Sequence, residues 1–251
     1  MRLVVIADVH ANWPALQVVL ADAAQLKADQ RVCLGDLVGY NAQPVECITA
    51  VREFCDVVIA GNHDWDIASV QEPLIGTTSH ARLVQAWTRE QLGDEHVAYL
   101  AQLPNKHIEA SVYIAVHGCY LNDVHVNGYV TQTMLRANLE ALAARDDWPS
   151  VGFSGHTHCP QLAYLRNGEV HTVKPLDPPV HWPADAQAVL INPGSVGQPR
   201  DEDPRCSYAL VDFEQRSVEF RRLDYDIDAT AAAAEGTGLP EVLVRRLYQG
   251  R

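Results

Sequence analysis

The chain has 251 residues, 47% of them hydrophobic, which is enough for one large α/β domain with a sizeable core. Its 19 lysine and arginine residues against 32 aspartate and glutamate residues give a formal net charge of -13, and without a basic block we do not expect long nucleic acid as a partner. No apolar run approaches the roughly 20 residues that span a bilayer, and Asp8 interrupts the first one, so we expect a cytoplasmic protein with no signal peptide and no membrane segment.

The first part of the chain alternates short β-branched runs with amphipathic segments. Strands are expected over residues 2–7, 31–34 and 56–60. Pro14 and Pro44 open the two helices between them, because proline suits the first helical turn and apolar residues follow at helical spacing. This βαβαβ order predicts a largely parallel sheet covered by helices.

The middle of the chain continues the alternation with longer helices. Helices are expected over 77–103 and 131–145, and strands over 111–116 and 151–154. The six cysteines are scattered, with no CxxC pair, and we expect them to be mostly reduced and buried.

The last third of the chain has strand patterns without intervening helices. Alternating runs around Asn167-Gly168 predict one hairpin, and residues 207–223 resemble a second. These strands suggest a second, more antiparallel sheet packed on the first. A Pro-rich stretch over 174–185 predicts an irregular loop, and residues 231–250 predict two short helices broken by glycines. We find no repeat or linker, so residues 1–251 are expected to form a single domain.

Five of the predicted strands end in residues that can bind metals. In open α/β sheets the carboxyl ends of parallel strands converge on one crevice, so we expect these side chains to meet. A single histidine or aspartate at a strand end is as often a turn or cap residue, but five such ends together favour a common site. In chain order the residues are Asp8, His10, Asp36, Asn62, His63, Asp64, His117, His156 and His158.

This mixture of imidazole, carboxylate and carboxamide groups favours transition metals over calcium or an all-sulfur site. Even seven of these nine residues are too many ligands for one ion. They suit two ions that share a bridging carboxylate, roughly 3.5–4 Å apart, and together activate a water. Glycines beside the ligands allow the backbone to approach closely; these are Gly35, Gly61, Gly118 and Gly155.

As an ordered set, the motifs D-x-H, G-D-x-x-G, G-N-H-D, H-G and G-H-T-H between residues 8 and 158 resemble those of the calcineurin-like metallophosphoesterases. The tract over 192–201 and the end of the chain extend the resemblance to small bacterial and archaeal phosphodiesterase-type members. The resemblance implies an α/β fold of two packed mixed β-sheets flanked by helices, a four-layer sandwich. It also implies two divalent or trivalent transition-metal ions, manganese first, with iron, zinc, cobalt or nickel as alternatives.

The resemblance further implies a role for each motif residue. One metal would be held by Asp8, His10, Asp36 and His158, and the other by Asp36, Asn62, His117 and His156. A hydroxide bridging the metals would attack phosphorus in line. His63 would stabilise the transition state and protonate the leaving oxygen. Asp64 would either orient His63 or begin a helix.

The substrate is less well defined by the sequence. Gly39-Tyr40 stands where many members that act on phosphoproteins carry an acidic-arginine pair, which weakens the protein-phosphatase interpretation. Arg200 either contacts phosphate or is a solvated loop residue. A further set of residues either lines a pocket for an organic moiety or merely packs: Tyr40, Asn41, Trp65, Tyr120 and His125.

We therefore expect a dinuclear metal-dependent phosphoesterase, with phosphodiesters first among a small set of phosphoester or nucleotide substrates. The alternatives are hydrolysis of dinucleoside polyphosphates of the Ap4A type and a protein phosphatase. A metal-binding scaffold without catalysis is the alternative from another class, because a fold does not fix a function. The sequence leaves the oligomeric state open, including a homo-oligomer.

Overall fold

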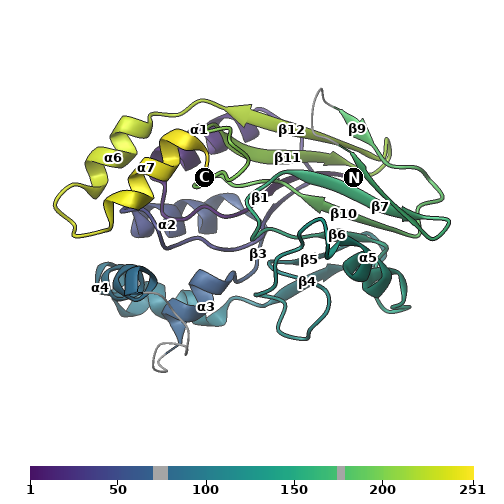
Figure 1. Cartoon of the computed structure of the whole chain (residues 1–251), viewed down its shortest axis with the longest axis horizontal. Coiled ribbons are helices and arrows are strands. Elements are labelled where there is room, and N and C mark those ends of the chain that lie inside the picture. The colour runs from purple at the N-terminus through teal and green to yellow at the C-terminus, as the bar shows by residue number, and fades with distance from the viewer. Residues whose placement is uncertain (70–78, 174–178) are drawn as a thin grey trace.

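The strands form two six-stranded mixed sheets in the computed structural model, which describes residues 1–69, 79–173 and 179–251 (Figure 1). The first sheet has the order β3-β2-β1-β11-β12-β9, with β1 Arg2–Ile6, β2 Gln30–Cys33, β3 Val57–Val58, β9 Val180–His181, β11 Cys206–Asp212 and β12 Ser217–Leu223. The second has the order β4-β5-β6-β10-β7-β8, with β4 Lys106–Glu109, β5 Tyr113–Val116, β6 Val151–Phe153, β7 Gln161–Arg166, β8 Glu169–Val173 and β10 Ala188–Asn192. The helices are α1 Trp13–Ala23, α2 Pro44–Phe54, α3 Asn62–Ala68, α4 Ser79–Gln102, α5 Leu135–Ala143, α6 Ile227–Ala234 and α7 Glu241–Gln249.

The predicted βαβαβ unit is confirmed at the start of the first sheet. Strands β1, β2 and β3 are parallel neighbours, and α1 and α2 connect them. Both helices carry proline in the first turn, and the side chain of Asn12 caps α1 by accepting a hydrogen bond from Ala15 N at 3.3 Å. The chain order therefore brings the carboxyl ends of three strands to one edge.

The two predicted hairpins are confirmed, but the sheets are not divided along the chain as expected. Asn167 and Gly168 join β7 to β8 with φ of 51° and 76°, as a tight hairpin turn requires. The second hairpin, β11–β12, joins the first sheet, where β11 pairs antiparallel with β1. The physical reason is that β1 is buried almost throughout. The main-chain N–H and C=O groups on both of its edges therefore need hydrogen-bond partners, so a strand pairs with each edge.

Several predicted helix boundaries shift because of local hydrogen bonds. Helix α5 begins at Leu135, after a turn in which Met134 N donates to Thr131 O at 2.9 Å. Helix α6 begins earlier than expected because Asp226 caps it, accepting from Ala229 N at 2.8 Å. Helix α4 is kinked at Gly93, and residues 77–78 of its prediction lie outside the described residues. Of the predicted loop over 174–185, residues 174–178 also lie outside them, and β9 is a short strand rather than loop.

Three apolar clusters define four layers in the order helix, sheet, sheet, helix. One cluster packs α1, α2 and α4 on the first sheet, and another packs α5 on the second. The third lies between the sheets and includes Tyr113, Phe153 and Leu162. The predicted fold class, two packed mixed sheets flanked by helices, is confirmed.

All six cysteines are free and four are buried, and no described helix is long and apolar enough to cross a membrane.

The cluster between the sheets yields a stability prediction. Phe153 is fully buried, and its ring meets Tyr113 edge-on at 5.2 Å between centroids. Because Phe153→Ala leaves a cavity between two layers, it should lower the free energy of unfolding by about 3–5 kcal/mol. Urea denaturation measures the change. Val124→Ala, at a side chain that is 46% exposed, is the control and should shift it by less than about 0.5 kcal/mol. Equal shifts would contradict the assignment of this core.

Candidate metal centre

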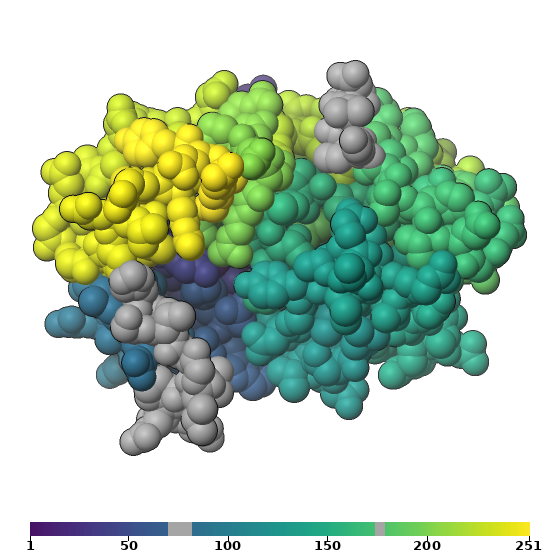
Figure 2. Space-filling model, in the orientation of Figure 1, coloured from purple at the N-terminus to yellow at the C-terminus, as the bar shows by residue number. Residues whose placement is uncertain are grey.

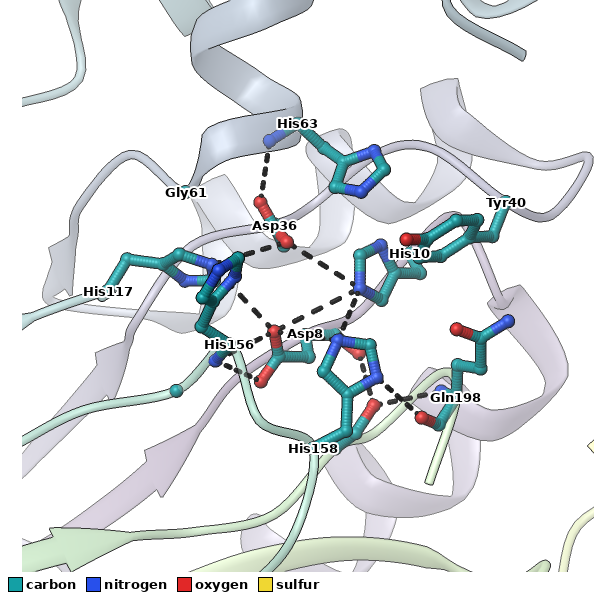
Figure 3. Close-up of polar contacts among 12 residues, drawn as sticks. Asp8, His10, Asp36, Tyr40, Gly61, His63, His117, His156, His158 and Gln198 are labelled. Carbon is teal, nitrogen blue, oxygen red and sulfur yellow. Dashed lines mark hydrogen bonds and ion pairs between the residues drawn. The ribbon is translucent and has the colours of Figure 1, made fainter. Parts of the chain in front are cut away.

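The carboxyl ends of strands from both sheets meet in one buried cluster of acidic and imidazole side chains (Figure 3). The loops after β1 and β2 supply Asp8, His10 and Asp36, and the loops after β5 and β6 supply His117, His156 and His158. Asn62 is the first residue of α3, which follows β3. The convergence expected from the sequence is thus present, with ligand residues from both sheets rather than from a single parallel one.

Two groups of potential ligand atoms share Asp36. In each group the atoms lie within 4.8 Å of one another, and all the residues are buried. The first group is Asp8, His10, Asp36 and His158, and the second is Asp36, His117 and His156. The buried Oδ1 of Asn62, the predicted fourth member of the second group, has no hydrogen-bond partner among the described residues.

Three of the histidines are held so that Nε2 is the nitrogen free for a ligand role. In each of them Nδ1 faces a main-chain carbonyl at hydrogen-bond distance, and donation from Nδ1 leaves Nε2 unprotonated when the ring is neutral, as it must be to bind a metal. The pairs are His10 with Val38 O at 3.1 Å, His117 with Leu34 O at 2.8 Å and His158 with Gln198 O at 2.6 Å. Figure 3 shows these rings directed toward the two aspartates.

The inward atoms repel one another unless a cation lies among them. With both Nδ1 atoms donating, the Nε2 atoms of His10 and His158 face each other at 3.1 Å as two lone pairs. Asp36 Oδ2 lies 3.6 Å from His10 Nε2 and 3.3 Å from His117 Nε2. Among the described residues this oxygen has no hydrogen-bond donor. Buried lone pairs arranged in this way are suited to bind metal ions, so the chemistry of these residues fits a metal site.

The pKa shifts agree with this interpretation. Burial lowers the pKa of His10 and of His158 well below the usual value and lowers that of His156 to about 3, so these rings are neutral, the form that binds metals. For His117 burial acts in the same direction, but the carboxylates of Asp36 and Asp8 outweigh it and raise the pKa to about 9. The negative charge at the centre therefore favours a cation there.

The backbone at the centre is strained. Five of the seven predicted ligands have positive φ, which costs a residue other than glycine roughly 1–3 kcal/mol: Asp8 (54°), His10 (48°), Asp36 (54°), His156 (65°) and His158 (60°). Hydrogen bonds between the loops sustain this conformation, as from His10 N to Asp36 O at 2.8 Å. A Cβ on Gly35 would lie 2.2 Å from Gly61 N, so the close approach of these two loops requires glycine.

His63 lies beside the centre and belongs to neither ligand group. Its main-chain N donates to Asp36 Oδ1 at 2.8 Å, and its ring lies 4.9 Å from that of His10 and 4.5 Å from that of Tyr40, between centroids. Its Nδ1 is buried without a hydrogen-bond partner among the described residues. A Cβ on Gly39 would lie 2.4 Å from this atom, so Gly39 leaves the space that the ring occupies.

Asp64 takes the helix-start role of its two predicted alternatives. Its carboxylate accepts hydrogen bonds from Gly61 N and Leu37 N, both at 2.9 Å, and burial raises its pKa to about 7. It thereby fixes the start of α3 and the loop that carries Asp36. The prediction that Asp64 orients the ring of His63 is not supported, because its carboxylate is used by these two amides.

Three of the predicted pocket residues are buried and hydrogen-bond to main-chain carbonyls. Asn41 is buried and donates from Nδ2 to His10 O at 2.8 Å, which holds a ligand loop. Tyr120 is buried and its hydroxyl donates to Phe153 O at 2.7 Å. His125 is buried with Nδ1 3.0 Å from Cys119 O. None of the three is among the residues that line the pocket described next. Trp65 is 45% exposed on α3 and lies outside the pocket described next.

Tyr40 and Arg200 do line a pocket, of about 750 Å³, beside the centre. Arg200 Nη2 donates to Gln198 Oε1 at 2.9 Å and to Tyr40 Oη at 3.3 Å. The pocket also contains Tyr129, which stacks on His156 with 4.0 Å between centroids and was missed in the sequence. No sequence motif marks Tyr129 or the part of α7 that completes the pocket. Tertiary packing brings both to the site.

Comparisons with known proteins agree with this geometry. A sequence profile of the calcineurin-like phosphoesterase superfamily domain matches residues 1–216. An uncharacterized protein of Methanocaldococcus jannaschii is 30% identical over 252 residues, covering 99% of this chain and 98% of that protein. The crystal structure of a metallophosphoesterase from Sphaerobacter thermophilus has a TM-score of 0.84 at 36% identity, with both chains covered completely. A hypothetical protein of Pyrococcus horikoshii shares the fold, with a TM-score of 0.80 at 22% identity, covering 100% of this chain and 98% of that one.

The shared position of Asp36 yields a prediction for metal content. Asp36→Ala removes an oxygen ligand from both groups, so the purified protein should lose most of its metal, from about two ions per chain to well below one. Elemental analysis by mass spectrometry measures the content. Asp66→Ala is the control, because Asp66 is a nearby carboxylate that pairs with Gln85 and lies in neither group. Full metal content in Asp36→Ala would contradict the shared role.

Proposed function

The chain belongs to the calcineurin-like phosphoesterase superfamily, and from this membership and its buried donor set we propose that it is a dinuclear metal-dependent phosphoesterase that acts first on phosphodiesters. The observation that carries the proposal is Asp36, which is 1% exposed, is shared by two groups of ligand atoms and faces the Nε2 atoms of two histidines. A metal-binding scaffold would need the same ligands, so His63, an imidazole beside the centre that belongs to neither ligand group, is the feature that favours catalysis over a scaffold.

The residues that would hold each ion follow from the two groups. Asp8, His10, Asp36 and His158 would bind one, and Asp36, His117, His156 and Asn62 the other. When bound, two such ions activate a water molecule and neutralise charge that develops on the phosphoryl oxygens. The nitrogen and oxygen donors suit manganese first, with iron, zinc, cobalt or nickel as alternatives.

His63 is the proposed proton donor to the leaving oxygen. The donated hydrogen bond from its main-chain N to Asp36 fixes its position relative to the ligands, while its ring remains outside both groups. A bound phosphoester brings negative charge toward this ring and so favours its protonated form. An imidazole there can give up its proton to the departing oxygen as the bond to phosphorus breaks.

Arg200 is the proposed contact for a phosphoryl oxygen that is not displaced. Its guanidinium is half-buried, and its hydrogen bonds to Gln198 and Tyr40 hold it at the pocket beside the centre. The main-chain N of Arg200 also donates to His158 O at 3.3 Å, which couples this arginine to a ligand loop. A guanidinium held in this way can bind a phosphate oxygen with little loss of side-chain freedom.

A second candidate is the hydrolysis of dinucleoside polyphosphates, which the volume of the pocket and its arginine lining favour. A substrate panel separates the two functions. The manganese-loaded protein should hydrolyse bis(p-nitrophenyl) phosphate if the first proposal is correct. Turnover of dinucleoside polyphosphates in strong preference to aryl diesters would instead establish the second, and no turnover of any phosphoester would refute both.

The proposed role of His63 predicts a dependence on the leaving group. His63→Asn should retain its metals but lower kcat by about 10²–10⁴-fold for esters with poor, alkoxide leaving groups. The loss should be smaller for p-nitrophenyl esters, because p-nitrophenolate departs without a proton. Steady-state kinetics on both esters and metal analysis of the same sample measure these effects.

The control is His171→Asn, at a histidine of β8 that stacks on Tyr164 away from the ligand groups. It should leave the kinetics unchanged. An equal loss of kcat for both leaving groups in His63→Asn, or the loss of its metals, would count against the proton-donor role.

A further inference from the structure

The pocket beside the metal centre is lined on one side by residues that contact predicted metal ligands and on the other by the last helix. Tyr40 packs on His10 with 4.5 Å between ring centroids, and Tyr129 stacks on His156. The opposite wall is formed by α7 and the residue that ends the chain: Val242, Arg245, Arg246, Gln249 and Arg251. Figure 2 shows this yellow C-terminal segment facing teal residues of the middle of the chain across an opening.

The periodicity of α7 separates a packing face from a pocket face. Leu243 and Leu247, four residues apart, are buried. The pocket-lining residues recur at intervals of three and four along the same helix, which places them together on another face: Val242, Arg245, Arg246 and Gln249. The two arginines are therefore presented to the pocket by the same packing that buries the leucines.

Helix α7 is fixed to the loop that carries Arg200. Gly250, which ends the helix with φ of 61°, accepts a hydrogen bond at its carbonyl from Glu202 N at 2.9 Å. A Cβ at Gly250 would come within 2.6 Å of Asp203 N, so helix and loop are in close contact. This junction holds the arginines of α7 at a defined position relative to Arg200, two residues before Glu202.

The charges on this wall are not equally compensated. Arg251 forms an ion pair with Glu202 at 2.8 Å. Arg200 is hydrogen-bonded to Gln198 and Tyr40. In contrast, no carboxylate of residues 1–69, 79–173 or 179–251 forms an ion pair with Arg245 or Arg246, although the chain carries a net charge of -13. Two adjacent guanidinium groups on an exposed helix face repel each other, and an anion between them relieves this repulsion.

We propose that Arg245 and Arg246 form a second anion subsite, which binds a phosphate of the substrate other than the one under attack. The inference rests on the proposed phosphoesterase function and narrows its substrate class to organic molecules with at least two phosphates. Guanidinium groups bind phosphate oxygens in pairs, and a pocket of about 750 Å³ is large enough for a ligand of nucleotide size. Inorganic phosphate or a simple monoester would use only the part of the pocket beside the metal centre.

The test compares ligands that differ in phosphate number. Isothermal titration of the metal-loaded protein measures Kd for adenosine monophosphate and for a non-hydrolysable, methylene-bridged adenosine triphosphate. The wild type should bind the triphosphate more tightly. The preference is the Kd for the monophosphate divided by the Kd for the triphosphate. In Arg245→Gln/Arg246→Gln this ratio should fall at least about tenfold, because charged hydrogen bonds to the outer phosphates are lost.

The matched control is Arg136→Gln/Arg166→Gln, which removes the same charge at two exposed arginines paired with Glu140 and Asp185. It should leave the ratio of Kd values within about twofold, since those guanidinium groups lie outside the pocket. An equal fall in the control would assign the effect to overall charge and overturn the subsite. Circular dichroism of both double variants confirms that they are folded.

Turnover on the same samples separates this inference from the function on which it rests. A wild type that hydrolyses aryl phosphodiesters but binds the monophosphate and triphosphate equally overturns the subsite and leaves the phosphoesterase in place. The opposite result is a wild type that hydrolyses no phosphoester but prefers the triphosphate, with that preference lost in Arg245→Gln/Arg246→Gln. This result would support the subsite and refute the phosphoesterase.

Discussion

The structure depends on the burial of two carboxylates and several neutral imidazoles within a few ångströms of one another. Asp8 and Asp36 are almost inaccessible to solvent, and in the neutral rings of His10 and His158 the Nε2 atoms that face this cluster carry lone pairs rather than protons. Such a cluster is costly in a protein interior unless positive charge lies within it. The left-handed backbone at five ligand residues adds further strain. The fold tolerates this arrangement because its rigid elements hold every member, and metal ions supply the charge that the cluster lacks.

The two-sheet architecture explains why the ligands can converge. Strand β1 lies near the middle of the first sheet, with β2 parallel on one side and β11 antiparallel on the other, so the loop after β1 emerges from a fully supported strand. The loops after β5 and β6 reach the same place from the second sheet, and His156 N donates to the carboxylate of Asp8 at 3.1 Å. Packing of Phe153 and its neighbours between the sheets thus holds the ligands from one sheet beside those from the other. Stability and chemistry are linked through this layer.

The sequence predicted the parts of the molecule that depend on local pattern. Alternation of strands and helices, prolines at helix starts and the Asn167-Gly168 turn are local features, and ligands at strand ends follow from the geometry of parallel strands. The sequence did not predict that β11 joins β1, because pairing at the second edge of a strand is decided by tertiary packing. The same limit applies to Asn41, Tyr120 and His125, whose polar atoms are used inside the protein. It applies also to α7, whose approach to the site depends on contacts of Gly250 with a loop distant in sequence.

The most direct test of the central claim is the anomalous scattering of a crystal of the manganese-loaded protein, measured on both sides of the manganese absorption edge. We predict two anomalous peaks roughly 3.5–4 Å apart, both in contact with Asp36, one beside His10 and His158 and the other beside His117 and His156. A single peak, or peaks that do not involve Asp36, would contradict a shared dinuclear centre.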